Sequence, residues 1–218
     1  MIFNNSKKLQ FTTDLKLKGE RLNIVDETKL LGLIITSDLK WNKNTEKIVK
    51  DANMKMKMLH IASKFVMNKQ DLVHIYKTYI RSRLEYSCTV WHNSLSKMNE
   101  SDIERIQKSA LKLILKDKYE DYESSLKLLN LESLHERRNK LCLRFAKRCL
   151  KMQNFKKLFP VRKIKHDIMK RNSEKYLIKN MNTERYKKSA IPAMKRMLNN
   201  EEIKMKKFAN NVFLTLSL

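Results

Sequence analysis

Cysteine and histidine are the first residues in this sequence that could do chemistry. Cys88 and His92 lie four residues apart, a spacing that could serve a metal site or a thiol nucleophile with its base. The spacing matches no CxxC pair, no second close ligand pair accompanies it, and neither an orienting acid nor a glycine loop lies nearby. We therefore expect Cys88 to be a small buried hydrophobic residue and His92 a hydrogen-bonded or solvated loop residue.

Glycines and paired aspartates, the residues of phosphate loops and magnesium sites, are scarce. The chain has two glycines, Gly19 and Gly32, which are too isolated to form a phosphate-binding loop. No two aspartates are adjacent. The sequence thus predicts no catalytic residue, no metal site and no cofactor within this chain.

Basic residues carry the stronger signal. The 218 residues contain 48 Lys and Arg against 23 Asp and Glu, a formal net charge of +25. Such an excess favours a polyanionic partner, with nucleic acid ahead of an anionic membrane surface. At about 100° per residue, one predicted helix places a row of lysines opposite its apolar face: Lys43, Lys47, Lys50, Lys57 and Lys64. A second row follows a later helix: Arg137, Lys140, Arg144, Lys147, Arg148 and Lys151.

These rows have two explanations. Every amphipathic helix needs a solvated face, and lysine often supplies it. However, few acids interrupt either row, which favours contact with a line of phosphates. Arg81 and Arg83, in the segment RSRLEYSCTVWHNSL, are further candidates for phosphate contact. We expect an RNA–DNA hybrid or a DNA duplex as the partner; the alternative is a helical module that binds a protein through its apolar faces.

The elements that must position these residues change along the chain. Both glycines lie within residues 1–36, where apolar and β-branched stretches such as KLLGLIIT predict short strands. From about Trp41 apolar residues recur at helical spacing, so we expect a mainly α fold with a small antiparallel β segment at the N-terminus. The predicted division is 1–36 for strands, 37–159 for a helical bundle, and 160–218 for a basic tail that is helical or partly disordered and broken at Pro192.

Several helices can be delimited within the bundle. Asn68 is a suitable cap for one helix, and Ser101-Asp102-Ile103-Glu104 has the spacing of a capping box for the next. A shorter helix is predicted around Ser124 to Leu129 and a long one from about Leu134. The expected inward residues of the four long helices are Ile48, Ala52, Leu59, Ala62 and Val66; Leu72, Tyr76, Tyr79, Ile80 and Leu84; Ile103, Ile106, Ala110, Leu113 and Ile114; and Leu141, Cys142, Phe145 and Cys149.

Targeting signals are missing from the sequence. No stretch approaches the roughly 18 apolar residues of a transmembrane helix, and MIFNNSKKLQ lacks the order of a signal peptide. Three cysteines are an odd and sparse set, which suits a reducing compartment. We expect a soluble intracellular protein of the nucleus or cytoplasm, without membrane association.

Four segments in this order resemble the C-terminal part of reverse transcriptases from non-LTR (LINE-type, jockey-like) retrotransposons. They are KLLGLIITSDLKW at 29–41, IRSRLEYSCTVWHNSL at 80–95, DIERIQKSALKLIL at 102–115 and LNLESLHERRNKLCLRFAKRCLK at 129–151. The resemblance implies that MIFNN is the last palm strand and that Leu31-Gly32 is the primer-grip turn. It also implies that the helices after Trp41 form the thumb, which holds the template–primer duplex.

The resemblance also implies a limit on activity. The catalytic aspartates of such polymerases would lie upstream of Met1, together with the Mg²⁺ that they bind. The expected chain is therefore an inactive fragment of an RNA-directed DNA polymerase, or the relic of a decayed element, whose residual role is to bind nucleic acid. In this frame Tyr86, Val90 and Trp91 are expected to pack together where two thumb helices cross.

Overall fold

The structure, a computed structural model, describes residues 1, 3, 15–65, 67–161, 175–178 and 183–215, with side chains to residue 204. It is mainly helical, with two small antiparallel strand pairs near the N-terminus, so the predicted fold class is confirmed. Val66 and most of the MIFNN segment lie outside the described residues. Contacts divide the chain into unit 1, which comprises Met1–Ser87 and Leu95–Leu134, and unit 2, which comprises Cys88–Ser94 and His135–Leu218. This division does not coincide with the predicted boundaries after residues 36 and 159.

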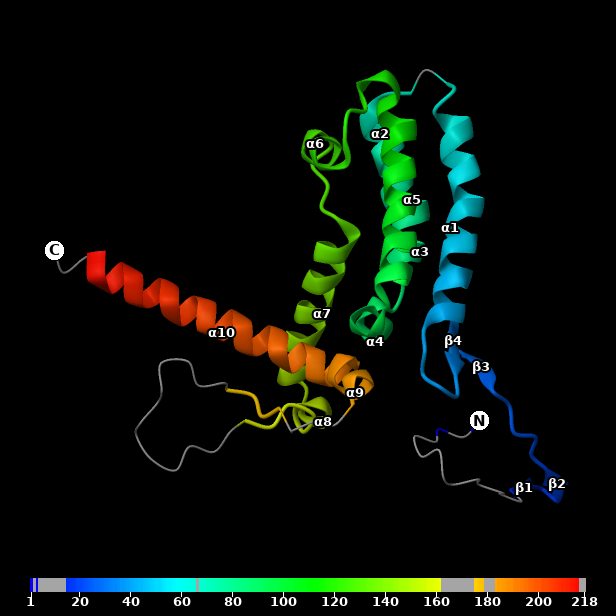
Figure 1. The fold of residues 1–218 in the computed structure, drawn as a ribbon, viewed down its shortest axis with the longest axis vertical. Helices are drawn as coiled ribbons and strands as arrows, with labels where there is room; N and C mark the ends of the chain where they lie inside the picture. The colour runs from blue at the N-terminus through cyan, green and yellow to red at the C-terminus, as the bar shows by residue number, and fades with distance from the viewer. Residues whose placement is uncertain (2, 4–14, 66, 162–174, 179–182, 216–218) are drawn as a thin grey trace. The chain divides into compact units, whose positions relative to one another are not determined.

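Two hairpins form the β segment of unit 1 (Figure 1). Strand β1 (Lys16–Leu17) pairs with β2 (Glu20–Arg21), and β3 (Glu27–Leu30) pairs with β4 (Leu33–Thr36). The second hairpin turns through Leu31 and Gly32, whose φ angles are 46° and 84°. Two central residues with positive φ characterise the tight turn that matches the twist of paired strands, and glycine is favoured there because it lacks a Cβ.

Three helical segments of unit 1 lie side by side (Figure 1). The first is α1 (Asn42–Ala62), and the third is α5 (Lys97–Leu115). Between them, α2 (Lys69–Ile75), the π-helical η1 (Tyr76–Arg81) and α3 (Ser82–Glu85) form one continuous helix. The short η3 (Lys116–Lys118) and α6 (Tyr122–Leu128) follow α5. The buried apolar residues of the three segments include Ile48, Ala52 and Leu59; Leu72, Tyr76, Ile80 and Leu84; and Ile103, Ile106, Ala110, Leu111 and Ile114.

Several details of the predicted helices in unit 1 differ in the structure. Ala62 and Leu113, predicted to point inward, are only partly buried. Tyr79 is 50% exposed, because the wider π-helical turn rotates it out of the buried line. Helix α5 begins at Lys97 rather than near Ser101, since the Ser96 hydroxyl caps it by accepting a hydrogen bond from the Asn99 amide at 3.1 Å. The predicted Asn68 cap is confirmed, because its side chain accepts from the Asp71 amide at 2.8 Å.

Unit 2 is built around α7 (Leu134–Lys151). Its other helices are α4 (Cys88–Trp91), the 3₁₀ turn η2 (His92–Ser94), α8 (Gln153–Lys156), α9 (Glu184–Lys188) and α10 (Ala190–Thr215). One apolar cluster holds residues of α7 and α10 together with Phe159 and Tyr176: Cys142, Ala146, Cys149, Phe159, Tyr176, Met194 and Leu198. The region after residue 160 therefore contributes to a packed core.

Three side-chain and helix predictions for unit 2 need correction. Leu141 is only partly buried, and Phe145 is 39% exposed while its neighbour Ala146 is buried. The buried line of α7 therefore runs through Cys142, Ala146 and Cys149. Pro192 does not break the last helix, because it is the third residue of α10, where a backbone N–H has no partner within the helix.

Candidate nucleic-acid interface

The turn between β3 and β4 is fastened to the helices of unit 1 by two side-chain donors. The Tyr86 hydroxyl, directly after α3, donates to the Leu31 carbonyl at 2.9 Å. The Lys47 ammonium, on α1, donates to the Gly32 carbonyl at 2.9 Å. A Cβ on Gly32 would lie 3.4 Å from the Tyr86 ring, so the turn and the ring are in close contact. Tyr86 is half exposed and serves this hairpin, which differs from its predicted place in a helix crossing.

A basic pocket lies where this hairpin meets α1 and α3. Its volume is about 330 Å³, and the charged residues that line it are Lys29, Lys47, Asp51 and Arg83. Three cations against one carboxylate leave an excess of two positive charges. Asn44 also lines the pocket and is almost fully buried, with its carbonyl oxygen accepting from the Ile34 amide at 3.2 Å. The excess positive charge of this pocket suits an anionic group.

The lysine row on α1 is shorter in the structure than in the sequence. Lys43 forms an ion pair with Glu27 on β3, which raises the pKa of the ammonium group, and Lys47 is held by Gly32. Lys50, Lys57 and Lys64 remain exposed, and none of the three has an ion pair within the described residues. Lys50 and Lys57 are seven residues apart and share one side of α1, and Lys64 lies in the turn that directly follows the helix.

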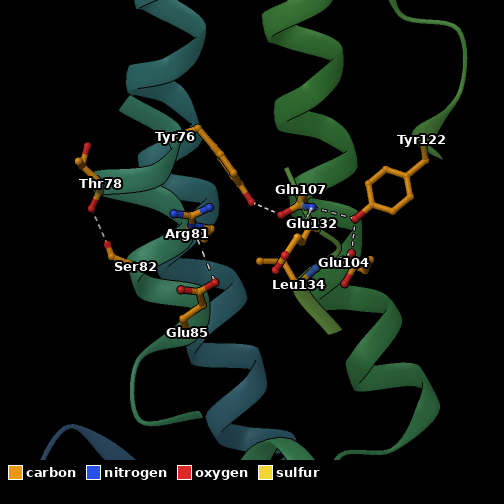
Figure 2. Close-up of polar contacts among 10 residues, drawn as sticks. All are labelled: Tyr76, Thr78, Arg81, Ser82, Glu85, Glu104, Gln107, Tyr122, Glu132 and Leu134. Carbon is orange, nitrogen blue, oxygen red and sulfur yellow. Dashed lines mark hydrogen bonds and ion pairs between the residues drawn. The ribbon is translucent and has the colours of Figure 1, made fainter. Parts of the chain in front are cut away.

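Arg81 and Arg83, at the start of the segment RSRLEYSCTVWHNSL, have different environments. Arg81 lies 3.8 Å from the Glu85 carboxylate, and the two side chains are only 16% and 12% exposed (Figure 2). This pairing holds the Arg81 side chain against the helices of unit 1. Its guanidinium group is therefore not accessible for the predicted contact with phosphate. Arg83 is exposed and lines the basic pocket.

The basic row on α7 is also only partly accessible. Lys147 forms an ion pair with Glu201 on α10 at 2.6 Å, and Arg137 is half-buried. Lys140, Arg144, Arg148 and Lys151 are exposed. The last three recur along one side of the C-terminal half of α7, and they have no ion pair among the residues that the structure describes. This row belongs to unit 2, whereas the row on α1 belongs to unit 1.

A polar network joins the helices on which α1 packs (Figure 2). Gln107 on α5 is fully buried; its carbonyl accepts from the Tyr76 hydroxyl, and its amide donates to the Tyr122 hydroxyl at 3.0 Å. The same amide donates to the Glu132 carbonyl at 2.9 Å. Glu104 accepts from the Tyr122 hydroxyl, and burial together with this carboxylate raises the pKa of Tyr122. The network joins the helix that contains η1 to α5, α6 and the segment before α7.

Sequence reasoning missed a buried arginine in unit 2. Arg138 on α7 is fully buried, and its Nε donates to Nδ1 of His92 at 3.1 Å while the guanidinium group lies 5.9 Å from the centre of the Trp91 ring. His92 therefore carries its proton on Nε2, which donates to the Asn139 carbonyl at 3.1 Å. Arg138 follows Arg137, the first residue of the basic row predicted on this helix, and no signal in the sequence distinguishes the inward arginine from those of the row.

The residues between Cys88 and His92 follow their predicted roles only in part. Cys88 is buried and does not form a disulfide, and His92 is hydrogen-bonded, as expected. Trp91 is fully buried, but Val90 is largely exposed and does not share its packing. A hydrogen bond with Cys88 lowers the pKa of the Cys142 thiol.

Metal-ligating residues do not cluster in the described part of the chain. No group of three or more His, Cys, Asp and Glu side chains there could hold an ion. Among the same residues, no helix combines the length and apolar character needed to cross a bilayer. Comparisons with protein-family models, curated proteins and solved structures found no match to the chain.

Proposed function

We propose that this chain binds a nucleic-acid duplex, an RNA–DNA hybrid or DNA, through basic helix faces. Its closest functional analogue is the thumb of a non-LTR retrotransposon reverse transcriptase. The observation that carries the proposal is the row of Lys50, Lys57 and Lys64, three exposed ammonium groups without an ion pair among the described residues. A row of this kind neutralises successive phosphates and releases their counterions.

Two further features support the same role. The basic pocket lined by Lys29, Lys47 and Arg83 lies beside the Leu31-Gly32 turn, which the resemblance equates with a primer grip. The exposed cations of α7 offer a second row, on unit 2. The proposed role is binding without polymerisation, because none of the four resembling segments carries the catalytic aspartates. A nuclear or cytoplasmic location is part of this proposal.

The test is a salt titration with a matched control. We expect the triple substitution Lys50→Gln, Lys57→Gln and Lys64→Gln to keep the helix, since glutamine and lysine have similar helix propensities. Each lost phosphate contact makes the slope of log affinity against log salt shallower by about 0.9 on double-stranded DNA. Fluorescence anisotropy with a labelled RNA–DNA hybrid should therefore give a slope shallower by about two to three units, at every sequence tested.

The control removes the same charge elsewhere in unit 1. Lys97, Lys118 and Lys127 are exposed, and none has an ion pair among the described residues. Their replacement by glutamine should change the affinity and the slope much less. Equal losses in both triple variants would show a diffuse cationic surface and would refute a binding role for this face of α1.

A further inference from the structure

The exposed face of α1 carries apolar side chains as well as lysines. Met54, Met58 and Ile61 are 53%, 44% and 57% exposed, and Phe65, in the turn that follows the helix, is 66% exposed. Phosphate binding gives these residues no role, because a phosphate backbone does not remove apolar side chains from water. We call the four residues the apolar seam of α1.

The spacing of the seam is that of a coiled coil. Its members follow one another at intervals of four, three and four residues, which is the alternation of the d and a positions of a heptad. The opposite side of α1, with Ile48, Ala52 and Leu59, is buried in unit 1. The helix is therefore already formed and held by the core, with a second apolar side left in solvent.

The residues that flank the seam share one sign of charge. With Met54 and Ile61 as d positions, the g positions next to the seam within α1 are Lys50 and Lys57, and one e position is Lys55; Lys64 continues the same spacing in the turn after the helix. Position e and g side chains reach across a helix pair and decide which partner and which orientation are favoured. These lysines would face glutamate or aspartate in a matching helix.

We propose that the apolar seam of α1 docks an amphipathic helix of a partner protein, with apolar a and d positions and acidic e and g positions. A second copy of this chain fits poorly, because Lys50, Lys57 and Lys64 would face lysines across the pair. This docking site goes beyond nucleic-acid binding. It uses the apolar side chains beside the lysine row, so the two roles can be separated by substitution.

The experiment uses the full chain and a synthetic helical peptide as the probe. The labelled peptide has about three heptads, with isoleucine at a, leucine at d and glutamate at e and g. We expect saturable binding by fluorescence anisotropy, weakened about tenfold or more by Met58→Gln with Ile61→Gln, which leaves every lysine in place. The matched control variant combines Met98→Gln and Leu128→Gln, which replace two exposed apolar residues elsewhere in unit 1. This variant should bind the peptide with unchanged affinity.

Two comparisons separate seam docking from charge attraction and from the nucleic-acid role. A peptide of the same composition, with its apolar residues moved off the a and d positions, should bind at least about tenfold more weakly. The Met58→Gln, Ile61→Gln variant should keep the affinity and salt slope of the full chain for the RNA–DNA hybrid. Circular dichroism melting of both double variants checks that the fold survives.

Any of five results would overturn the proposal. Equal binding of the off-register peptide would show charge attraction alone, and equal binding by the seam variant would show docking elsewhere. If the seam variant lost hybrid affinity as strongly as peptide affinity, the seam would belong to the nucleic-acid interface. If the chain self-associated in analytical sedimentation and the seam variant did not, the seam would bind a second copy of this chain. Failure to bind the peptide, with seam-dependent binding to phosphatidylserine vesicles, would indicate a lipid surface.

Discussion

The buried network around Gln107 predicts a measurable energetic coupling. Gln107→Leu keeps the approximate size of the side chain but removes its hydrogen bonds to the Tyr76 hydroxyl, the Tyr122 hydroxyl and the Glu132 carbonyl. At about 1 kcal/mol for each buried hydrogen bond, with leucine contributing some apolar packing in return, the expected loss of unfolding free energy is about 2–4 kcal/mol. Tyr76→Phe removes one of these bonds and should cost about 1 kcal/mol.

The double variant provides the decisive comparison. The bond between Tyr76 and Gln107 is lost in each single variant, so the double variant should be less destabilised than the sum by about 1 kcal/mol. Tyr79→Phe is the control, because this hydroxyl lies three residues further along the same helix and is half exposed. Its cost should stay within about 0.5 kcal/mol.

Urea unfolding can report on unit 1 alone. The chain has two tryptophans, Trp41 in unit 1 and Trp91 in unit 2. A Trp91→Phe background leaves Trp41, which is buried, as the fluorescent probe. If the costs of Tyr76→Phe and Gln107→Leu add within about 0.3 kcal/mol, the two side chains do not share a bond and the network is wrong.

Three further predictions concern stability. Amides of residues 15–36 should exchange faster with deuterium than those of α5, because β1 to β3 are exposed and each belongs to a sheet of only two strands. Uniformly strong protection of residues 15–36 would contradict this prediction. Trp91→Ala should cost about 3–5 kcal/mol in thermal or urea unfolding, and Cys88→Ser should cost less; an unchanged melting curve for Trp91→Ala would refute the packing role. The pKa of Asp121, the cap of α6, is lowered by the Ser124 hydroxyl and amide, so its stabilising effect is present above about pH 4 and lost in more acidic solution. Asp121→Asn should therefore lower stability near neutral pH and reduce its loss on acidification, measured by melting temperature against pH.

Local patterns in the sequence predicted local features well. Asn68 could be recognised as a cap from its position before an apolar helical repeat, and Ile48, Ala52 and Leu59 from their spacing. Each of these features depends on interactions within a few residues or on one helical period. The strand predicted for KLLGLIIT is wrong in one respect, because Leu31 and Gly32 form a turn inside it and divide it between β3 and β4; only the family resemblance had placed a turn there.

The accessible part of the basic rows could not be predicted in this way. Lys43 and Lys147 meet carboxylates 16 and 54 residues away in the sequence, and Lys47 meets the carbonyl of a turn 15 residues earlier. Helical spacing shows which residues share a face, but it does not show which of them find a partner on another element. The apolar seam of α1 could not be predicted either, because helical spacing does not show that Met54 and Met58 remain exposed beside the lysines.

The π-helical turn η1 explains why the helix that contains it holds one residue more than a regular α-helix with the same buried face would need. The buried residues Leu72, Tyr76, Ile80 and Leu84 are spaced by four, and in a regular α-helix each such step would drift by about 40° around the axis. The wider π turn takes up this drift and keeps all four on the core side. Removing one residue between Tyr76 and Ile80 would restore a regular α-helix in which the same four side chains still share one face, because the spacing becomes four, three and four. This helix is therefore a place where the fold can lose one residue, and a one-residue gap in this stretch of a related chain would signify the same core built on an unbroken α-helix.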